Sequence, residues 1–236
     1  MAVTLNSIYA DVLAQINSLD ATTVALLQTV YQAAVGGSIA DVDMNSTDWA
    51  IDQIKNAILD AELELINEIC QNPKHPERGT FQKTSSNITS GDAVPATASD
   101  LTPFFGQFDY AKETSGSLIL TPRPLLVVQA AIRNSNSTFS ANYRALCWCI
   151  AGGTVLHNSS GTINLVGVGA ARNTFPSGSI RLRDYYRPAV VAGAMLKMLP
   201  KEGANPTAFQ EYSQLYNGQL AQIRAIGQAT GAPTPA

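Results

Sequence analysis

Apolar residues recur at helical spacing near the start of the chain. Over Leu5–Leu19 they fall three or four positions apart, which is typical of an amphipathic helix. A second short apolar face covers 24–34 and ends at Gly36-Gly37, whose backbone freedom suits the end of a helix. The pattern therefore predicts a helical hairpin over residues 5–35.

A longer helical pattern runs from about Thr47 to Cys70. Its apolar residues form one stripe over Ile51–Ile69, with a second apolar edge beside it. Two neighbouring apolar faces on one helix indicate burial on more than one side. The prolines in Asn72-Pro73 and His75-Pro76 should end this helix, because a residue before proline is disfavoured in the helical conformation.

After Gly79 the chain becomes rich in Thr, Ser, Gly and Pro, with short β-prone runs between them. Such runs, bounded by turn residues, predict strands. The four best candidates are Leu118–Leu120, Leu125–Ile132, Leu146–Ile150 and Thr162–Val168. Residues 84–103 are polar and contain Gly and Pro, which predicts an extended arm rather than core.

Helical spacing returns near Tyr185. Pro188 suits the first turn of a helix that Pro200 ends. Asn205-Pro206 then combines a capping residue with proline at the first helical position, and apolar residues continue over Phe209–Ile226. These features predict a closing helical hairpin.

Together the patterns predict an α+β fold in which the N-terminal and C-terminal helices form one core. Residues 1–78 and 185–226 would supply that core, and 79–184 would be a β-rich insertion. Residues 227–236 have no apolar periodicity and should form a flexible tail that orders only on a partner. Its members, the predicted assembly contacts, are Gly227, Gln228, Ala229, Thr230, Gly231, Ala232, Pro233, Thr234, Pro235 and Ala236.

Charge is sparse in this sequence. Charged residues make up 14% of the chain and hydrophobic residues 45%, whereas soluble domains average roughly 25% charged. A surface so weakly charged predicts that partners cover part of it. The net charge of −3 argues against a surface that grips phosphates, which needs clustered cations. The one basic cluster comprises Arg172, Arg181, Arg183 and Arg187.

No membrane contact is expected, because no apolar run approaches the roughly 20 residues of a membrane-spanning helix. The first residues also lack the charged and apolar regions of a signal peptide. These features predict an intracellular product.

Cys147-Trp148-Cys149, with His157 nearby, is the first candidate for chemistry. Metal-binding cysteines are usually two to four residues apart, whereas these are separated by one. In a strand this spacing places both thiols on one face and Trp148 on the other. We therefore expect two small buried side chains on the core face, and no metal or cofactor.

The two histidines, His75 and His157, each follow turn-forming residues and are expected to be partly exposed in loops. No Gly-x-Ser-x-Gly motif presents a nucleophile to either one. The chain is therefore not expected to be an enzyme.

Two further motifs have simpler explanations. Gly167-Val-Gly169 lacks the third glycine and the following helix of a dinucleotide-binding loop, so it predicts a strand that is closely approached by backbone. Glu62, Glu64 and Glu68 flank the apolar stripe of a helix and predict a solvated face.

Two parts of the sequence resemble head-to-tail adaptor (connector) proteins of tailed bacteriophages. AELELINEIC followed by QNPKHPERGTF resembles the central helix of that family and its proline-rich exit. YYRPAVVAGAMLKMLPKEGANP followed by AFQEYSQLYNGQLAQIRAI resembles its closing helical hairpin. The β-rich block departs from the small all-helical members and would be an insertion.

The resemblance implies a virion protein that is made in the host cytoplasm and located in the neck. It implies a ring of identical subunits, commonly about twelve, which contacts the portal and the tail or nozzle proteins. DNA would pass through its channel without sequence-specific binding. Two alternatives remain open: another virion protein, such as a tail-completion or minor capsid protein, or a β module on helical flanks that binds a partner or carbohydrate.

Overall fold

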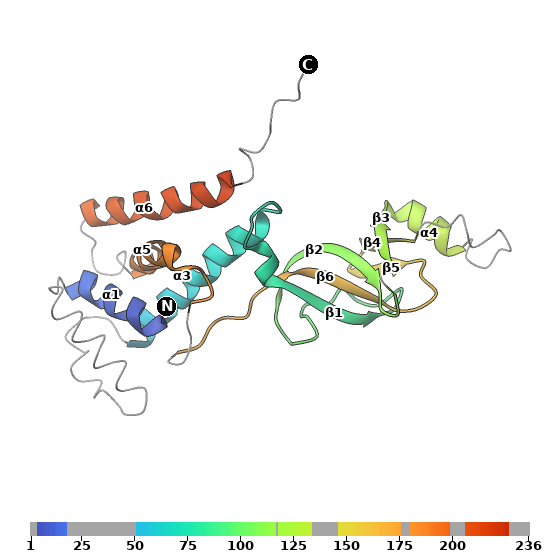
Figure 1. Ribbon diagram of the computed structural model, residues 1–236, viewed down its shortest axis with the longest axis horizontal. Coiled ribbons are helices and arrows are strands. Elements are labelled where there is room, and N and C mark those ends of the chain that lie inside the picture. The colour runs from blue at the N-terminus through green and yellow to red at the C-terminus, as the bar shows by residue number, and fades with distance from the viewer. Residues whose placement is uncertain are drawn as a thin grey trace, which may run out of the picture. The chain divides into compact units, whose positions relative to one another are not determined.

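The computed structural model describes residues 4–17, 51–116, 118–133, 146–175, 180–198 and 206–226. They fall into two compact units (Figure 1). We call Met1–His75 with Arg172–Ala236 the helical unit, and Pro76–Ala171 the sheet unit. With helices and one mixed sheet, the fold class is α+β, as predicted.

The helical unit contains four of the described helices. They are α1 (Leu5–Asn17), α3 (Ile51–Gln71), α5 (Arg187–Met198) and α6 (Pro206–Ala225). A short 3-10 helix, η6 (Asp184–Tyr186), leads directly into α5. All four helices lie where the apolar spacing predicts them. The helix predicted over 24–34 lies outside the described residues.

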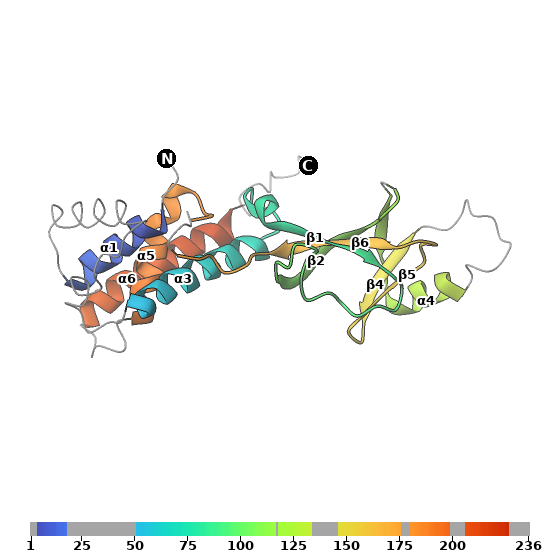
Figure 2. The same cartoon turned by 90° about the horizontal axis from the view of Figure 1, so that it is seen from below.

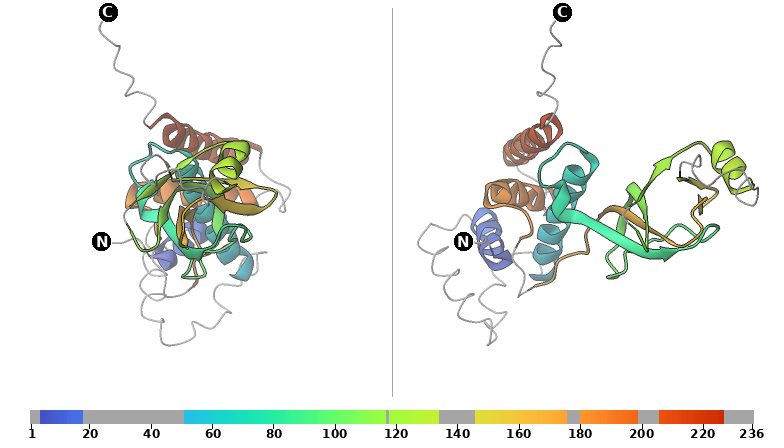
Figure 3. Two further views of the ribbon diagram at one scale, coloured as in Figure 1. Left: turned by 90° about the vertical axis from the view of Figure 1, so that its right-hand side faces the viewer. Right: turned by 45° about the vertical axis from the view of Figure 1, so that its right-hand side comes forward.

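Helix α5 is the centre of the helical unit. It contacts α1, α3 and α6, and Figure 3 shows it between α6 and α1. It is buried nearly all round rather than on one face. Its buried residues are mostly small: Ala189, Val190, Val191, Ala192, Gly193, Ala194, Met195 and Met198. Small side chains let neighbouring helices approach from several sides.

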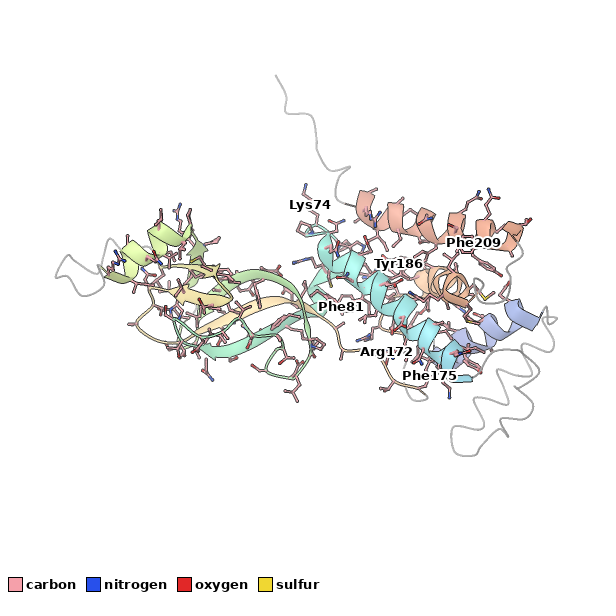
Figure 4. All side chains as sticks on the ribbon, turned by 180° about the vertical axis from the view of Figure 1, so that it is seen from behind. Lys74, Phe81, Arg172, Phe175, Tyr186 and Phe209 are labelled. Carbon is pink, nitrogen blue, oxygen red and sulfur yellow. The ribbon has the colours of Figure 1, made fainter. Side chains whose placement is uncertain are left out.

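Side-chain hydrogen bonds tie the ends of the helices together. The Asn72 amide, just after α3, donates to the carbonyl oxygens of Ile223 (2.9 Å) and Ile226 (2.8 Å). These are among the carbonyls that the end of α6 leaves without helical partners. The Tyr186 hydroxyl lies 3.1 Å from His75 Nε2, and both side chains are buried; Figure 4 shows Tyr186 beside α3. His75 is therefore not the exposed loop residue expected from the sequence.

The described residues of the sheet unit form one six-stranded sheet and one α-helix (Figure 2). In chain order its elements are η3 (Arg78–Phe81), β1 (Gln82–Ile88), β2 (Phe104–Glu113), β3 (Ile119–Pro122), α4 (Leu125–Arg133), β4 (Cys147–Ala151), β5 (Thr154–His157) and β6 (Ile163–Gly169). The strands lie in the order β1-β6-β2-β3-β4-β5. Only β3 and β4 pair in parallel, because α4 lies in the connection between them.

Residues 84–103 do not form the predicted extended arm. Residues 84–88 belong to β1, and the following loop covers both edges of the sheet. Gly91 N donates to Val155 O of edge strand β5 (2.7 Å), and Ser99 N donates to Thr84 O of edge strand β1 (2.9 Å). Polar side chains of the loop add to this pairing, since Ser99 Oγ accepts from Ser86 N of β1 and Ser90 Oγ accepts from His157 N of β5, each at 3.0 Å. This pairing protects strand edges that would otherwise be open to other chains.

The strand predictions were partly right. β3, β4 and β6 lie at the predicted places, and Gly152 and Gly153, with φ of 56° and 77°, form the turn between β4 and β5. The strand predicted over Leu125–Ile132 is wrong, since this segment is helix α4. Its Leu-Leu-Val-Val run is β-prone, but Pro124 favours the start of a helix. Val128 is the residue that this helix buries.

Gly193 should be indispensable for the packing of α5. A Cβ atom there would lie 2.9 Å from Tyr216 Cε2 on α6 and 3.0 Å from Ala61 Cβ on α3. We predict that Gly193→Ala lowers the free energy of unfolding of the helical unit by about 1–3 kcal/mol. The measurement is urea unfolding followed by far-UV circular dichroism. In the control Gly218→Ala, no atom lies near the added Cβ, and the better helix propensity should raise stability by about 1 kcal/mol. Equal effects of the two substitutions would contradict the prediction.

Gly169 should be equally important in the sheet unit. Its strand passes so close to the neighbouring backbone that a Cβ would lie 2.1 Å from Pro103 O, as the glycine motif predicted. We expect Gly169→Ala to destabilise the sheet unit by about 1–3 kcal/mol or more, measured as the urea midpoint by tryptophan fluorescence. Gly161→Ala, where no atom lies within 4 Å, is the control and should shift the midpoint little.

Candidate assembly surface

The tail predicted to make assembly contacts, Gly227–Ala236, lies outside the described residues. The structure does define where it starts. Ile226 ends the described chain just after α6, where Asn72 holds its carbonyl oxygen. The residue that precedes the tail is therefore held at the ends of α3 and α6.

The basic cluster is occupied by ion pairs within the helical unit. Arg172 pairs with Asp60 at 2.7 Å, and Arg187 pairs with Asp11 at 2.6 Å. Figure 4 shows Arg172 beside α3. Because carboxylates already neutralise these cations, they are poorly suited to collect phosphates.

Helix α3 carries a row of carboxylates at four-residue spacing: Asp60, Glu64 and Glu68. Besides the pair with Arg172, Glu64 pairs with Lys197 of α5 at 2.5 Å, and Glu68 pairs with Arg224 of α6 at 2.9 Å. The prediction of a solvated face is thus incomplete, since each carboxylate connects α3 to another segment. Exposed pairs contribute little stability one by one, but they fix which segment lies against which turn of α3.

Glu62 contradicts that prediction outright, because its side chain is fully buried. Its carboxylate accepts hydrogen bonds from Arg181 N at 2.7 Å and from the Asn173 amide at 3.2 Å. A buried carboxylate is tolerated only when such donors replace water. Glu62 therefore holds the chain segment before η6 against α3.

The cysteines and His157 do not come together. Cys149 and Trp148 alternate along β4, and Trp148 lies directly opposite His157 of β5. Opposite residues of paired strands share a face, so His157 lies with Trp148 and away from both thiols. Trp148, rather than the cysteines, belongs to the main apolar core of the sheet unit. Cys147 is buried, as expected, whereas Cys149 is only partly buried and Trp148 is buried on the other face. Among the described residues no group of three or more His, Cys, Asp or Glu side chains is placed to hold a metal ion.

His157 is buried instead of exposed. Its Nε2–H donates to Ile88 O, 3.3 Å away at the end of β1, and so links the two edge strands of the sheet. His157 Nδ1 and Trp148 Nε1 are buried, and neither finds a hydrogen-bond partner within the described residues. Burial lowers the pKa of His157 below its ordinary value of 6.5, because the charged ring would lose its water.

Exposed apolar side chains gather on β3, the first turn of α4, and β4. Six of the ten large hydrophobic residues exposed in the described part of the chain lie there: Leu118, Ile119, Leu125, Leu126, Val127 and Ile150. Leu126 is 78% exposed. Figures 1 and 2 place α4 at the end of the sheet unit away from the start of β1. Such a concentration of apolar surface marks a contact site on proteins that work in assemblies.

Sequence reasoning missed this surface because it assigned residues 125–132 to a strand. In a strand, alternate residues of the Leu-Leu-Val-Val run would be buried. In the helix, Val128 is buried and the three residues before it are exposed. The signals for the helix were Pro124 before the run, and Gln129-Ala130-Ala131 after it, which are poor strand formers.

Helix α6 presents the second exposed surface. Ile223 is its only buried residue among those described, while Phe209 and Leu215 are 40% and 44% exposed; Figure 4 shows Phe209 on α6.

Among the described helices, none combines the length and the apolar character that crossing a membrane requires.

No protein-family model and no curated protein matches this sequence.

The burial of His157 predicts a pH dependence. Below about pH 6.5 the unfolded chain binds a proton at this histidine, whereas the folded chain resists it. Proton binding therefore favours the unfolded chain. The folded state keeps its full stability above about pH 6.5 and loses some of it as the pH falls, so the urea midpoint of the sheet unit should decline between pH 7 and pH 5. In His157→Gln that decline should be smaller. Equal slopes in the two proteins would contradict the prediction.

Proposed function

We propose that this chain is a structural subunit of a bacteriophage head-to-tail connector. Copies would form a ring below the portal that joins capsid to tail and surrounds the channel for DNA. In this proposal the helical unit is the core of the subunit, and the sheet unit is an insertion within it. Such a subunit would lie in the neck of the virion.

The observation that carries the proposal is the packing of the two segments that resemble the connector family. The whole sheet unit separates α3 from α5 and α6 in sequence, yet α3 contacts both of those helices. Lys197 and Arg224, on the closing hairpin, pair with carboxylates of α3. The two stretches thus form one structural unit, as a shared helical core would require.

The electrostatics of the helical unit agree with a conduit for DNA. A channel that bound phosphates tightly would slow passage, because each contact has to be broken. Here Arg172, Arg187 and Lys197 are engaged with carboxylates of the same unit. Few cations are left to hold a passing duplex.

The exposed surfaces support an assembly role over a self-contained one. Apolar side chains on α4 and α6 remain in water when the chain is alone. An isolated chain gains nothing from this exposure, whereas a subunit would bury such side chains against its neighbours.

The proposal is tested through the tail. Truncation after Ile226 removes none of the described contacts, since Asn72 still holds Ile223 and Ile226. We predict that the truncated chain keeps its melting temperature and far-UV spectrum but is captured less by the purified portal and incorporated less into particles. A chain whose residues 227–236 are shuffled in order is the control for tail length. Assembly of the truncated chain at the full level would contradict the docking role of the tail. Failure of the full chain to bind portal or particles at all would contradict the proposed function.

A further inference from the structure

Helix α4 exposes a ridge of three residues that face away from β4. Leu126, Ala130 and Arg133 lie at helical spacing of four and then three, and all are exposed. They lie on the side opposite to Val128, which is fully buried. The ridge is therefore large at one end, small in the middle and cationic at the other end.

Helix α6 exposes a ridge of the same length with the opposite properties. Glu211, Leu215 and Gly218 are all exposed and also lie at spacing of four and then three. No atom lies within 4 Å of a Cβ built on Gly218, so the surface is open there. This ridge is anionic at one end, large in the middle and empty at the other end.

The two ridges match when the helices run antiparallel. Both span eight residues, whose seven steps cover about 10 Å along a helix. Leu126 then lies over Gly218, Ala130 over Leu215, and Arg133 beside Glu211. Each large side chain meets a small residue, which is how ridges of one helix fill grooves of another.

The charges of the chain favour the same pairing. No Asp or Glu occurs between Glu113 and Asp184, while Arg123 and Arg133 flank the exposed turn of α4. The sheet unit has six Lys and Arg against five Asp and Glu, and the helical unit has nine against thirteen. Neither Arg133 nor Glu211 makes an ion pair with the described residues. A cationic apolar ridge and an anionic one therefore remain unused on the two units of the chain.

We infer that α4 of one copy packs antiparallel on α6 of a second copy, through Leu126, Ala130 and Arg133 on the first and Gly218, Leu215 and Glu211 on the second. The inference rests on the proposed assembly role and names the partner for this surface. Because the two surfaces differ, the contact is head-to-tail and can continue from copy to copy into a ring.

The test is the association of the purified full-length chain at rising concentration, measured by sedimentation equilibrium. Leu126→Asn should raise the dissociation constant at least about tenfold, as expected when a fully buried leucine is lost from a contact. Leu101→Asn is the matched control, since Leu101 is 81% exposed and lies outside both ridges. It should change association less than about twofold.

Two further variants separate association from folding. Gly218→Leu should strengthen α6 as a helix while filling the groove that receives Leu126, so association should fall with no loss of helical content. Arg133→Glu and Glu211→Arg should each weaken association, and the two together should restore it to within about threefold of the original.

Three results would overturn the inference. The first is a chain that stays monomeric at all concentrations. The second is association that none of these substitutions changes. The third is a monomer whose sedimentation velocity, measured in parallel, changes on Leu126→Asn without a change in mass, which would place the contact inside one chain. The proposed function would survive each of these if the chain still bound portal through its tail.

Discussion

The helical unit depends on one constraint, namely that α5 must fit among three other helices at once. Alanine and glycine at Ala189, Ala192, Gly193 and Ala194 leave room for α1, α3 and α6. A bulkier helix would have to leave one of those neighbours in solvent. Since α3 and α6 lie at opposite ends of the sequence, this close packing joins the two ends into one unit. The hydrogen bonds and ion pairs around it then determine register rather than create the association.

The few charged residues of the chain are largely used in ion pairs that hold the helical unit together. Helix α3 is acidic, and each of its carboxylates beyond Lys55 meets a cation or donor from a segment distant in sequence. Asp60 meets Arg172, Glu62 meets Arg181, and Glu68 meets Arg224. These charges are used to order the chain internally. What remains at the surface is largely Gln, Asn, Thr and apolar side chains, which agrees with a protein that works inside an assembly.

The predictable and unpredictable parts of the fold differ in the range of the interactions that determine them. Helices α1, α3, α5 and α6 follow from apolar spacing, prolines and caps, which act over a few residues. Strands β1 and β2 were missed because polar residues such as those of Gln82–Ile88 become strands only by pairing with the apolar β6. The same holds for Glu62 and His157, whose burial depends on donors and acceptors brought from distant segments. Local patterns do not contain that information.

The two edge strands of the sheet are linked to each other and to the loop between β1 and β2, which limits how the sheet unit can bind a partner. The loop over residues 89–103 occupies both strand edges, and His157 links β5 to the end of β1. An extended peptide would have to displace this loop to add a strand at those positions, which disfavours strand addition there as a mode of partner binding. The apolar residues of β3, α4 and β4 remain exposed on this closed scaffold. Contacts of the sheet unit should accordingly be made by side chains on a preformed surface, which needs little ordering on binding. A subunit that must assemble in many copies with one geometry benefits from such a surface.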